Sequence, residues 1–312
     1  MQHIRMSAGR RARIARIARR GFTMVELLIA LVLLGLVSAA LYRVLVNNQR
    51  LYMAQTQRID LSQNIRAASN ILPAELREID AADGDIVAMS PIKLEIRAMR
   101  WIGFLCTAPV LGGGLNGLTM IIRGGAPGLP LFYGARGINV VSDTMLIYYD
   151  GDQTTRADDY WARGEFTGVA PAVANCPGLP LQTGRLVTFN LKLLGLGLNA
   201  PGAIPVGAPV RGYEHVIYQL YQPAGDTSYF VGFQPAAGAM QPLFGPVLTN
   251  GLTFQYYDVN GAITAVKSAV ARVDITVRAR TANAVRSGGQ APAATVVDSI
   301  STSVALRNNR RF

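Results

Sequence analysis

The sequence is poor in the residues that catalysis and metal binding most often use. Its 312 residues include only two histidines and two cysteines, too few cysteines for the clustered thiolates of a structural zinc site. No G-x-S-x-G, H-E-x-x-H or Walker pattern occurs, and the glycine-rich stretch at 112–117 does not connect a strand to a helix. His215 lies in a strand pattern, where a solvated or hydrogen-bonded histidine is the ordinary interpretation. We therefore expect neither an enzyme active site nor a cofactor.

Charged residues are also scarce, at 16% of the chain, whereas hydrophobic residues make up 50%. This balance supplies a sizeable core and argues against a disordered chain. The net charge is +11, but residues 1–20 hold seven arginines and no acid, which leaves +4 for the other 292 residues. A basic tail directly before an apolar run keeps the N-terminus of a membrane segment in the cytoplasm. No groove-binding or base-stacking motif accompanies the basic C-terminal end, so nucleic-acid binding is not favoured.

The apolar run covers 20 residues, from Phe22 to Leu41, and its only polar members are Thr23, Glu26 and Ser38. A helix of this length spans about 30 Å, the thickness of the hydrocarbon core of a bilayer. An ionisable residue inside a membrane span costs roughly 2.5–3.5 kcal/mol on insertion scales. Glu26 therefore indicates a function and a partner for its charge.

Three ordinary interpretations of this segment are incomplete. A cleaved secretory signal peptide has a shorter apolar run without a glutamate, a plain signal anchor leaves Glu26 unexplained, and a buried core helix leaves the arginines unexplained. A fourth interpretation accounts for all of these features. Cleavage after Gly21 would make the amine of Phe22 the new N-terminus, and Glu26 would be the fifth residue of the mature chain. Among parallel helices, this carboxylate could pair with the terminal amine of a neighbouring subunit and neutralise both charges.

The segment Gly21-Phe22-Thr23-Met24-Val25-Glu26 and the apolar run after it resemble the type III signal of type IV pilins and pseudopilins. The resemblance implies cleavage after Gly21 and N-methylation of Phe22 by a prepilin peptidase. It implies assembly with other pilin or pseudopilin subunits at an inner-membrane platform, and no enzymatic activity. The protein would cross the inner membrane once, with its C-terminal domain outside the cytoplasm, and then enter a pilus or pseudopilus. The leader is longer than in many major pilins, which favours a minor subunit.

Segments of the C-terminal half resemble the sheet strands of the minor pilins called PilW and of the J-type pseudopilins of type II secretion. They include SDTMLIYY (142–149), QPLFGPVLTNGLTFQYYDVNGA (241–262) and ARVDITVRAR (271–280). The sequence does not separate these two kinds of subunit, and it does not decide between the tip and the shaft of a filament. An uncleaved, membrane-anchored binding domain outside the cytoplasm is a further alternative.

The sequence predicts an α+β fold, with a long N-terminal transmembrane and amphipathic helix followed by a mainly antiparallel β-sheet domain. Its expected segments are a leader (1–21), a transmembrane helix (22–42), an amphipathic helix with a short second helix (43–82) and a β-rich domain (83–312). The amphipathic part is predicted from the helical spacing of Leu61, Ile65, Ala68, Leu72, Leu76 and Ile79.

Proline and glycine set the expected boundaries inside these segments. Pro73 cannot donate the internal hydrogen bond of a helix, so the long helix is expected to end near Leu72 and the short one to cover 73–81. Asn260-Gly261 and Gly225-Asp226 predict turns between strands, and the Gly-, Pro- and Ala-rich stretch 170–184 predicts a long loop.

Two further groups of residues are candidate sites. Cys106 and Cys176 permit one disulfide if the domain lies outside the cytoplasm, and the sequence leaves this pairing and two separate thiols equally open. Asp150, Asp152, Asp158 and Asp159 lie within ten residues, and clustered carboxylates can gather around a cation such as calcium. Their spacing does not match an EF-hand loop, so a solvated loop is the favoured interpretation.

Overall fold

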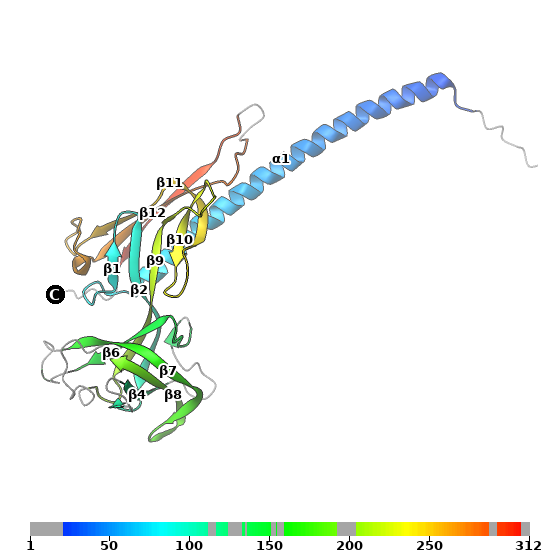
Figure 1. The fold of residues 1–312 in the computed structure, drawn as a ribbon. Helices are drawn as coiled ribbons and strands as arrows, with labels where there is room; N and C mark the ends of the chain where they lie inside the picture. The colour runs from blue at the N-terminus through cyan, green and yellow to red at the C-terminus, as the bar shows by residue number, and fades with distance from the viewer. Residues whose placement is uncertain are drawn as a thin grey trace, which may run out of the picture. The chain divides into compact units, whose positions relative to one another are not determined.

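The computed structural model describes residues 21–111, 117–123, 133–134, 136–150, 154, 159–191, 204–286 and 292–306 (Figure 1). It consists of one long N-terminal helix followed by antiparallel strands, which confirms the predicted α+β class. The chain divides into two compact units, with the boundary between Ala54 and Gln55, inside the helix. The predicted leader lies outside the described residues, apart from Gly21.

Helix α1 runs from Met24 to Arg77. In the second unit it packs on the sheet through one stripe of buried side chains, as the helical spacing predicts. These buried residues are Leu61, Ile65, Ala68, Leu72, Pro73 and Leu76. Ile79, the last residue of the predicted stripe, is also fully buried, although it lies beyond the end of the helix.

The prediction of a separate short helix over 73–81 is wrong, because α1 continues through Pro73 to Arg77. Pro73 leaves the carbonyl of Ser69 without its helical N–H donor, at a cost of roughly 3 kcal/mol. Leu72 and Leu76 flank the proline and are each 1% exposed. Burial of a leucine side chain contributes roughly 1.5–3 kcal/mol, so the two leucines together offset this cost. Continuous packing on the sheet therefore outweighs the local preference for a helix end.

The strands follow the helix in chain order, and all paired neighbours are antiparallel. A short 3₁₀ helix, η2 (Lys267–Ala269), lies between β11 and β12. The strands are β1 (Ile86–Met89), β2 (Lys93–Leu105), β3 (Val110–Leu111), β4 (Gly117–Arg123), β5 (Tyr133–Gly134), β6 (Asp143–Tyr149), β7 (Tyr160–Cys176), β8 (Leu179–Leu191), β9 (Pro209–Tyr221), β10 (Tyr229–Gln234), β11 (Gln241–Tyr257), β12 (Arg272–Arg280) and β13 (Val297–Ala305).

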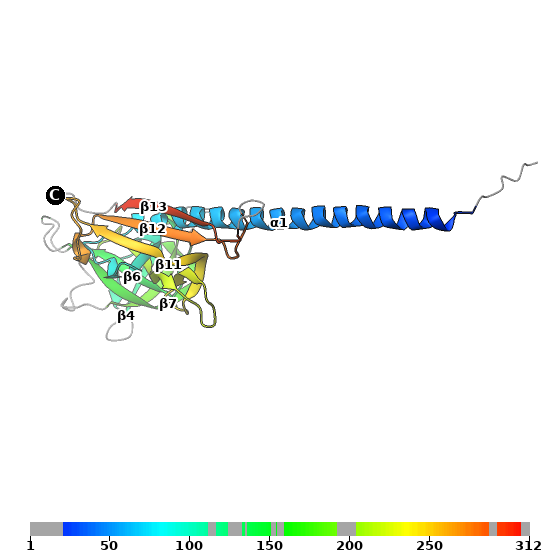
Figure 2. The ribbon, with the colours of Figure 1, turned by 90° about the horizontal axis from the view of Figure 1, so that it is seen from above.

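Seven of these strands form what we call the open sheet, in the order β1-β2-β9-β10-β11-β12-β13. Strands β11, β12 and β13 lie side by side at one end of it (Figure 2). The face toward α1 carries the larger hydrophobic core, in which alternating residues of each strand meet the helix stripe. Val273, Ile275 and Val277 of β12 are members of this core, as their alternation in the sequence predicts.

Strands β4, β6, β7 and β8 form a closed barrel together with β2 and β9. Strand β2 pairs with β4 and with β9, and the order β2-β4-β8-β7-β6-β9 returns to β2, so these strands form a six-strand barrel. A second core fills it, with contributions from every strand, such as Trp101 from β2, Met145 from β6 and Val210 from β9. Strands β2 and β9 therefore belong to both the open sheet and the six-strand barrel.

The loop predicted over 170–184 is wrong, because this stretch holds the end of β7 and the start of β8. The two strands pair across a tight turn at Pro177 and Gly178, where Gly178 has a φ of 72°, a backbone conformation that glycine adopts without a Cβ clash. The predicted turns at Asn260-Gly261 and Gly225-Asp226 are confirmed. In the first turn, the carboxylate of Asp258 accepts hydrogen bonds from the N–H groups of Asn260 and Ala262. In the second, the backbone N–H of Asp226 donates a hydrogen bond to the carbonyl of Pro223.

Candidate functional site

The segment that carries the predicted cleavage site leads directly into α1. Gly21, Phe22 and Thr23 have no regular secondary structure, and the helix begins at Met24. The hydroxyl of Thr23 accepts a hydrogen bond from the N–H of Glu26 at 3.3 Å, and the Thr23 carbonyl accepts one from Leu27 at 3.2 Å. Thr23 is therefore the N-cap of the helix. This role was not predicted from the sequence, although the Thr-x-x-Glu spacing is that of a capping box.

Glu26 lies in the first turn of α1. A carboxylate is favourable there because the unsatisfied N–H groups at the start of a helix carry partial positive charge. Both Glu26 and Phe22 are exposed, and Phe22 is 81% exposed. The predicted processing and assembly residues thus lie together on an accessible helix start, where an enzyme or a neighbouring chain can reach them.

The apolar part of α1 is exposed within the part of the chain that the structure describes. Every residue from Gly21 to Leu45 is exposed, and α1 contains a window long and apolar enough to cross a membrane, none of which is buried. An uncovered apolar surface of this extent marks a contact with a membrane or with other proteins. The helix is consistent with membrane anchoring near the N-terminus.

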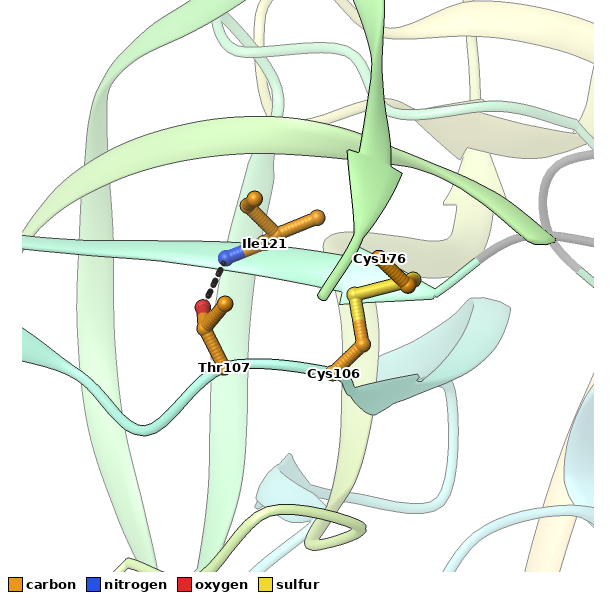
Figure 3. The surroundings of a disulfide bond; sticks show 4 residues. All are labelled: Cys106, Thr107, Ile121 and Cys176. Atoms are coloured by element: carbon orange, nitrogen blue, oxygen red, sulfur yellow. Dashed lines mark hydrogen bonds between the residues drawn. A yellow bond between two sulfur atoms is a disulfide. The ribbon is translucent and has the colours of Figure 1, made fainter. Parts of the chain in front are cut away.

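The structure joins Cys106 and Cys176 in a disulfide, with their Cα atoms 5.5 Å apart (Figure 3). Cys106 follows the last residue of β2, and Cys176 is the last residue of β7. Beside the disulfide, the N–H of Ile121 donates to the hydroxyl of Thr107 at 2.8 Å. The bond therefore connects two strands of the six-strand barrel at the tip of the β7–β8 hairpin.

The structure describes only two of the four clustered aspartates. Asp152 and Asp158 lie outside the described residues, whereas Asp150 and Asp159 lie within them. Asp159 accepts a hydrogen bond from the hydroxyl of Tyr148 at 2.6 Å. Among the residues that the structure describes, no group of three metal-ligating side chains comes together.

A comparison with protein families bears directly on the N-terminal segment. The family description "Prokaryotic N-terminal methylation motif" matches residues 16–42. The chain fits a type IV pilin-like protein. No significant match was found among curated proteins or among solved structures. The motif implies processing by a prepilin peptidase and assembly with other pilins, and it points to a structural subunit and not to an enzyme.

The β-rich domain and the end of α1 also share a charge network that was not predicted from the sequence. Arg100 on β2 contacts Glu75 of α1 at 2.8 Å and Glu214 of β9 at 2.9 Å. Burial acts to lower the pKa of Arg100, but the two carboxylates outweigh it and raise that pKa. Because these three residues come from α1, β2 and β9, the network fastens the end of the helix to the two strands shared by both cores.

The network continues into the six-strand barrel. Arg136 lies 3.3 Å from Glu214 and also pairs with Asp143, the first residue of β6. Hydrogen bonding to Asp143 raises the pKa of Arg136. Asp143 also accepts a hydrogen bond from the indole N–H of Trp101 at 3.1 Å. A single chain of ionic contacts thus runs from α1 to the barrel core.

A second buried pair lies where α1 ends and β1 begins. Arg211 of β9 contacts Asp85 at 3.0 Å, and Asp85 in turn accepts a hydrogen bond from the N–H of Asp80 at 2.8 Å. Burial raises the pKa of both aspartates. Arg211 also lies 4.8 Å from the centre of the Trp161 ring, a cation–π distance. This pair holds the turn after the helix against the shared strand β9.

Proposed function

We propose that the chain is a minor subunit of a type IV pilus or a related filament, made as a precursor, cleaved after Gly21 and N-methylated on Phe22. The observation that carries the proposal is the methylation motif over residues 16–42, which continues into an apolar helix whose membrane-length window is exposed in the described structure. The cap at Thr23 supports it, because it starts the helix two residues after the cleavage site and leaves Phe22 accessible.

In this proposal Glu26 carries the assembly step. The new amine of Phe22 is a cation, and Glu26 lies about one helical turn from it. A carboxylate buried alone among apolar helices is strongly penalised, whereas one paired with the amine of a neighbouring subunit is neutralised. The pair forms only at one axial offset between two helices, so it selects the register of assembly.

The compartment follows from the same arrangement. The seven arginines of residues 1–20 hold the leader in the cytoplasm, and the helix places the β-rich domain on the other side of the inner membrane. The disulfide supports this orientation, because disulfides persist in oxidising compartments and are rare in the cytosol.

The test is the intact mass and N-terminal sequence of the protein purified from its native membrane. We expect a chain that begins at N-methylated Phe22. A chain that retains Met1 would leave a plain membrane anchor, and a chain that begins near Ala40 would be a secreted domain. Either result would overturn the proposal.

The control variant is Gly21→Leu. We expect it to insert in the membrane but to keep residues 1–21, because a bulky side chain at the scissile bond prevents close approach of the peptidase. Normal cleavage of Gly21→Leu would mean that the Gly21–Phe22 bond is not recognised in the proposed way.

A further inference from the structure

Strand β13 is the last strand of the open sheet, and no strand among the described residues pairs with its outer side. It pairs with β12 over its full length, from Val297 with Arg280 to Ala305 with Arg272, without a register shift. A long, regular edge strand with unpaired backbone groups is a template for another strand.

The alternation of hydrogen bonds between β12 and β13 shows which backbone groups of β13 face outward. Leu306 donates to Ala271 and Thr281 donates to Val296, just beyond either end of the ladder. In an antiparallel pair the bonded positions alternate, so the even-numbered residues from 296 to 306 bond to β12. The N–H and C=O groups of the odd-numbered residues therefore point to the open side. The N–H of Ser299 is already taken by the side chain of Asp298. The other outward positions are Val297 at the start of the strand and Ser301, Ser303 and Ala305 in its second half.

The other edge of the open sheet is protected. Strand β1 has only four residues and a register shift after Ile86. The ammonium group of Lys267 donates to the carbonyl of Val87 at 2.8 Å, which occupies an acceptor on this strand. A short irregular edge with a lysine on it is a usual defence against strand addition. The six-strand barrel is protected by its closure.

Strand β13 has none of these defences over Ser301–Ala305. It contains no proline, no lysine and no bulge, and its only charged residue is Asp298, near its start. Its side chains alternate between a face with Ser299, Ser301 and Ser303 and a face toward the core of the open sheet, with Ile300, Thr302 and Val304.

We propose that β13 is the docking site for an extended segment of a neighbouring pilin-type subunit, which adds to the open sheet as a further strand. This inference rests on the proposed function, because a filament subunit must contact neighbours through its globular domain. The occupant is a different surface of the neighbour and not its own β13. Two β13 strands paired antiparallel would be related by a two-fold axis and would close a dimer, whereas a filament extends through heterologous contacts.

The chemistry of β13 defines the incoming segment. Its main chain must offer donors and acceptors opposite Ser301, Ser303 and Ala305. On the side of Ile300 and Val304 it should carry β-branched or apolar residues, which would extend the core. On the serine side it should carry small polar residues, since cross-strand pairs of hydroxyl side chains are favourable.

The experiment compares Ser301→Pro with Ser301→Ala in the full-length chain, expressed in its native cells. Proline at position 301 removes an N–H that faces the open side and leaves the hydrogen bonds to β12 intact. Edge strands tolerate proline at positions of this kind. Alanine is the matched control, because both variants lose the hydrogen bond between the hydroxyls of Ser301 and Thr276. We expect Ser301→Pro to be cleaved and folded like Ser301→Ala, but to be incorporated into filaments about tenfold less.

Equal incorporation of the two variants would overturn the docking site and leave the proposed function intact. Retention of residues 1–21 in the unmodified chain would overturn both. If Ser301→Pro melts well below Ser301→Ala, the double variant Ser301→Lys/Ser303→Lys decides, because it keeps every backbone group and places charge on the open edge. Wild-type incorporation of that double variant would refute the proposal, and an about tenfold loss would support it.

Discussion

At the scale of single residues, Glu26 has two physical roles that the structure brings to the same place. It stands at the third helical position after the Thr23 cap, where an anion stabilises the helix start. It is also the only carboxylate in the apolar run, where a neighbouring amine would be its partner. A residue at this position of a capping box can be neutral, because glutamine also supplies an acceptor oxygen, whereas pairing with an amine needs a charge.

Substitution of Glu26 separates these roles. We expect Glu26→Val and Glu26→Gln both to insert and to be cleaved after Gly21, and both to be absent from filaments, because neither can neutralise the terminal amine of a neighbour. Glutamine retains the capping-box acceptor. Filament incorporation of Glu26→Gln at wild-type levels, measured by immunoblot of sheared filaments, would reassign Glu26 to capping alone.

Asp80 gives the domain a pH dependence of defined sign. Burial and the nearby charge of Asp83 raise the pKa of its carboxyl group above the usual value of 3.8. Between that usual value and the raised pKa, the folded chain binds a proton that the unfolded chain has released. The free energy of unfolding should therefore fall as pH rises through this window.

Asp80→Asn should flatten this dependence in urea denaturation of the full chain in detergent. The asparagine oxygen can still accept the hydrogen bonds that Asp80 receives from the N–H groups of Ala82 and Asp83, so the local turn is kept. Asp85 also has a raised pKa and remains in the variant, so part of the slope should persist. An unchanged slope in Asp80→Asn would exclude Asp80 as a source.

At the scale of elements, α1 is held on the open sheet by one stripe of side chains, and neighbouring residues of the helix make a direct comparison. Leu72 is 1% exposed, whereas Ile71 is 37% exposed. Leu72→Ala should lower the free energy of unfolding by roughly 2–5 kcal/mol, the usual range for a fully buried leucine. Ile71→Ala should cost much less. Similar losses in the two variants, measured by urea denaturation, would contradict the packing described for the stripe.

How well an element could be predicted depended on whether its signal is local. The helix stripe and the alternating strand β12 follow from side-chain periodicity, and both were predicted. Strand β7 lacks that alternation around Ala170 and Pro171, and its strand pairing is decided by β8. The proline signal at Pro73 is also local, but burial of Leu72 and Leu76 outweighs it.

The candidate sites also differ in whether their residues are close together in the sequence. The N-terminal segment could be interpreted from sequence because Gly21, Phe22 and Glu26 are adjacent in the chain. The charge network could not, because Arg100 and Glu214 are 114 residues apart in sequence and meet only through the pairing of β2 with β9. The disulfide stayed open for the same reason, since its cysteines are 70 residues apart.

At the scale of the whole molecule, removal of the disulfide would show how much it contributes to the stability of the six-strand barrel. A cross-link over 70 residues restricts the unfolded chain by about 4 kcal/mol in the chain-entropy description. The double variant Cys106→Ala/Cys176→Ala should therefore unfold at clearly lower urea concentration than the wild type. Cleavage after Gly21 should be unaffected, because the processing segment belongs to the other unit. An unchanged denaturation midpoint would mean that the barrel core alone sets the stability.

The sharing of β2 and β9 between the two cores has a mechanical consequence. Their pairing runs from Lys93 with Gln219 to Phe104 with Pro209, across the boundary between the open sheet and the six-strand barrel. A pulling force between the two cores would therefore act along two continuous covalent chains. To separate the cores, β2 and β9 would have to slide along their other neighbours, so the hydrogen bonds to those strands would be loaded in shear, all together. A load on the six-strand barrel would thus be passed to the open sheet without peeling the two cores apart.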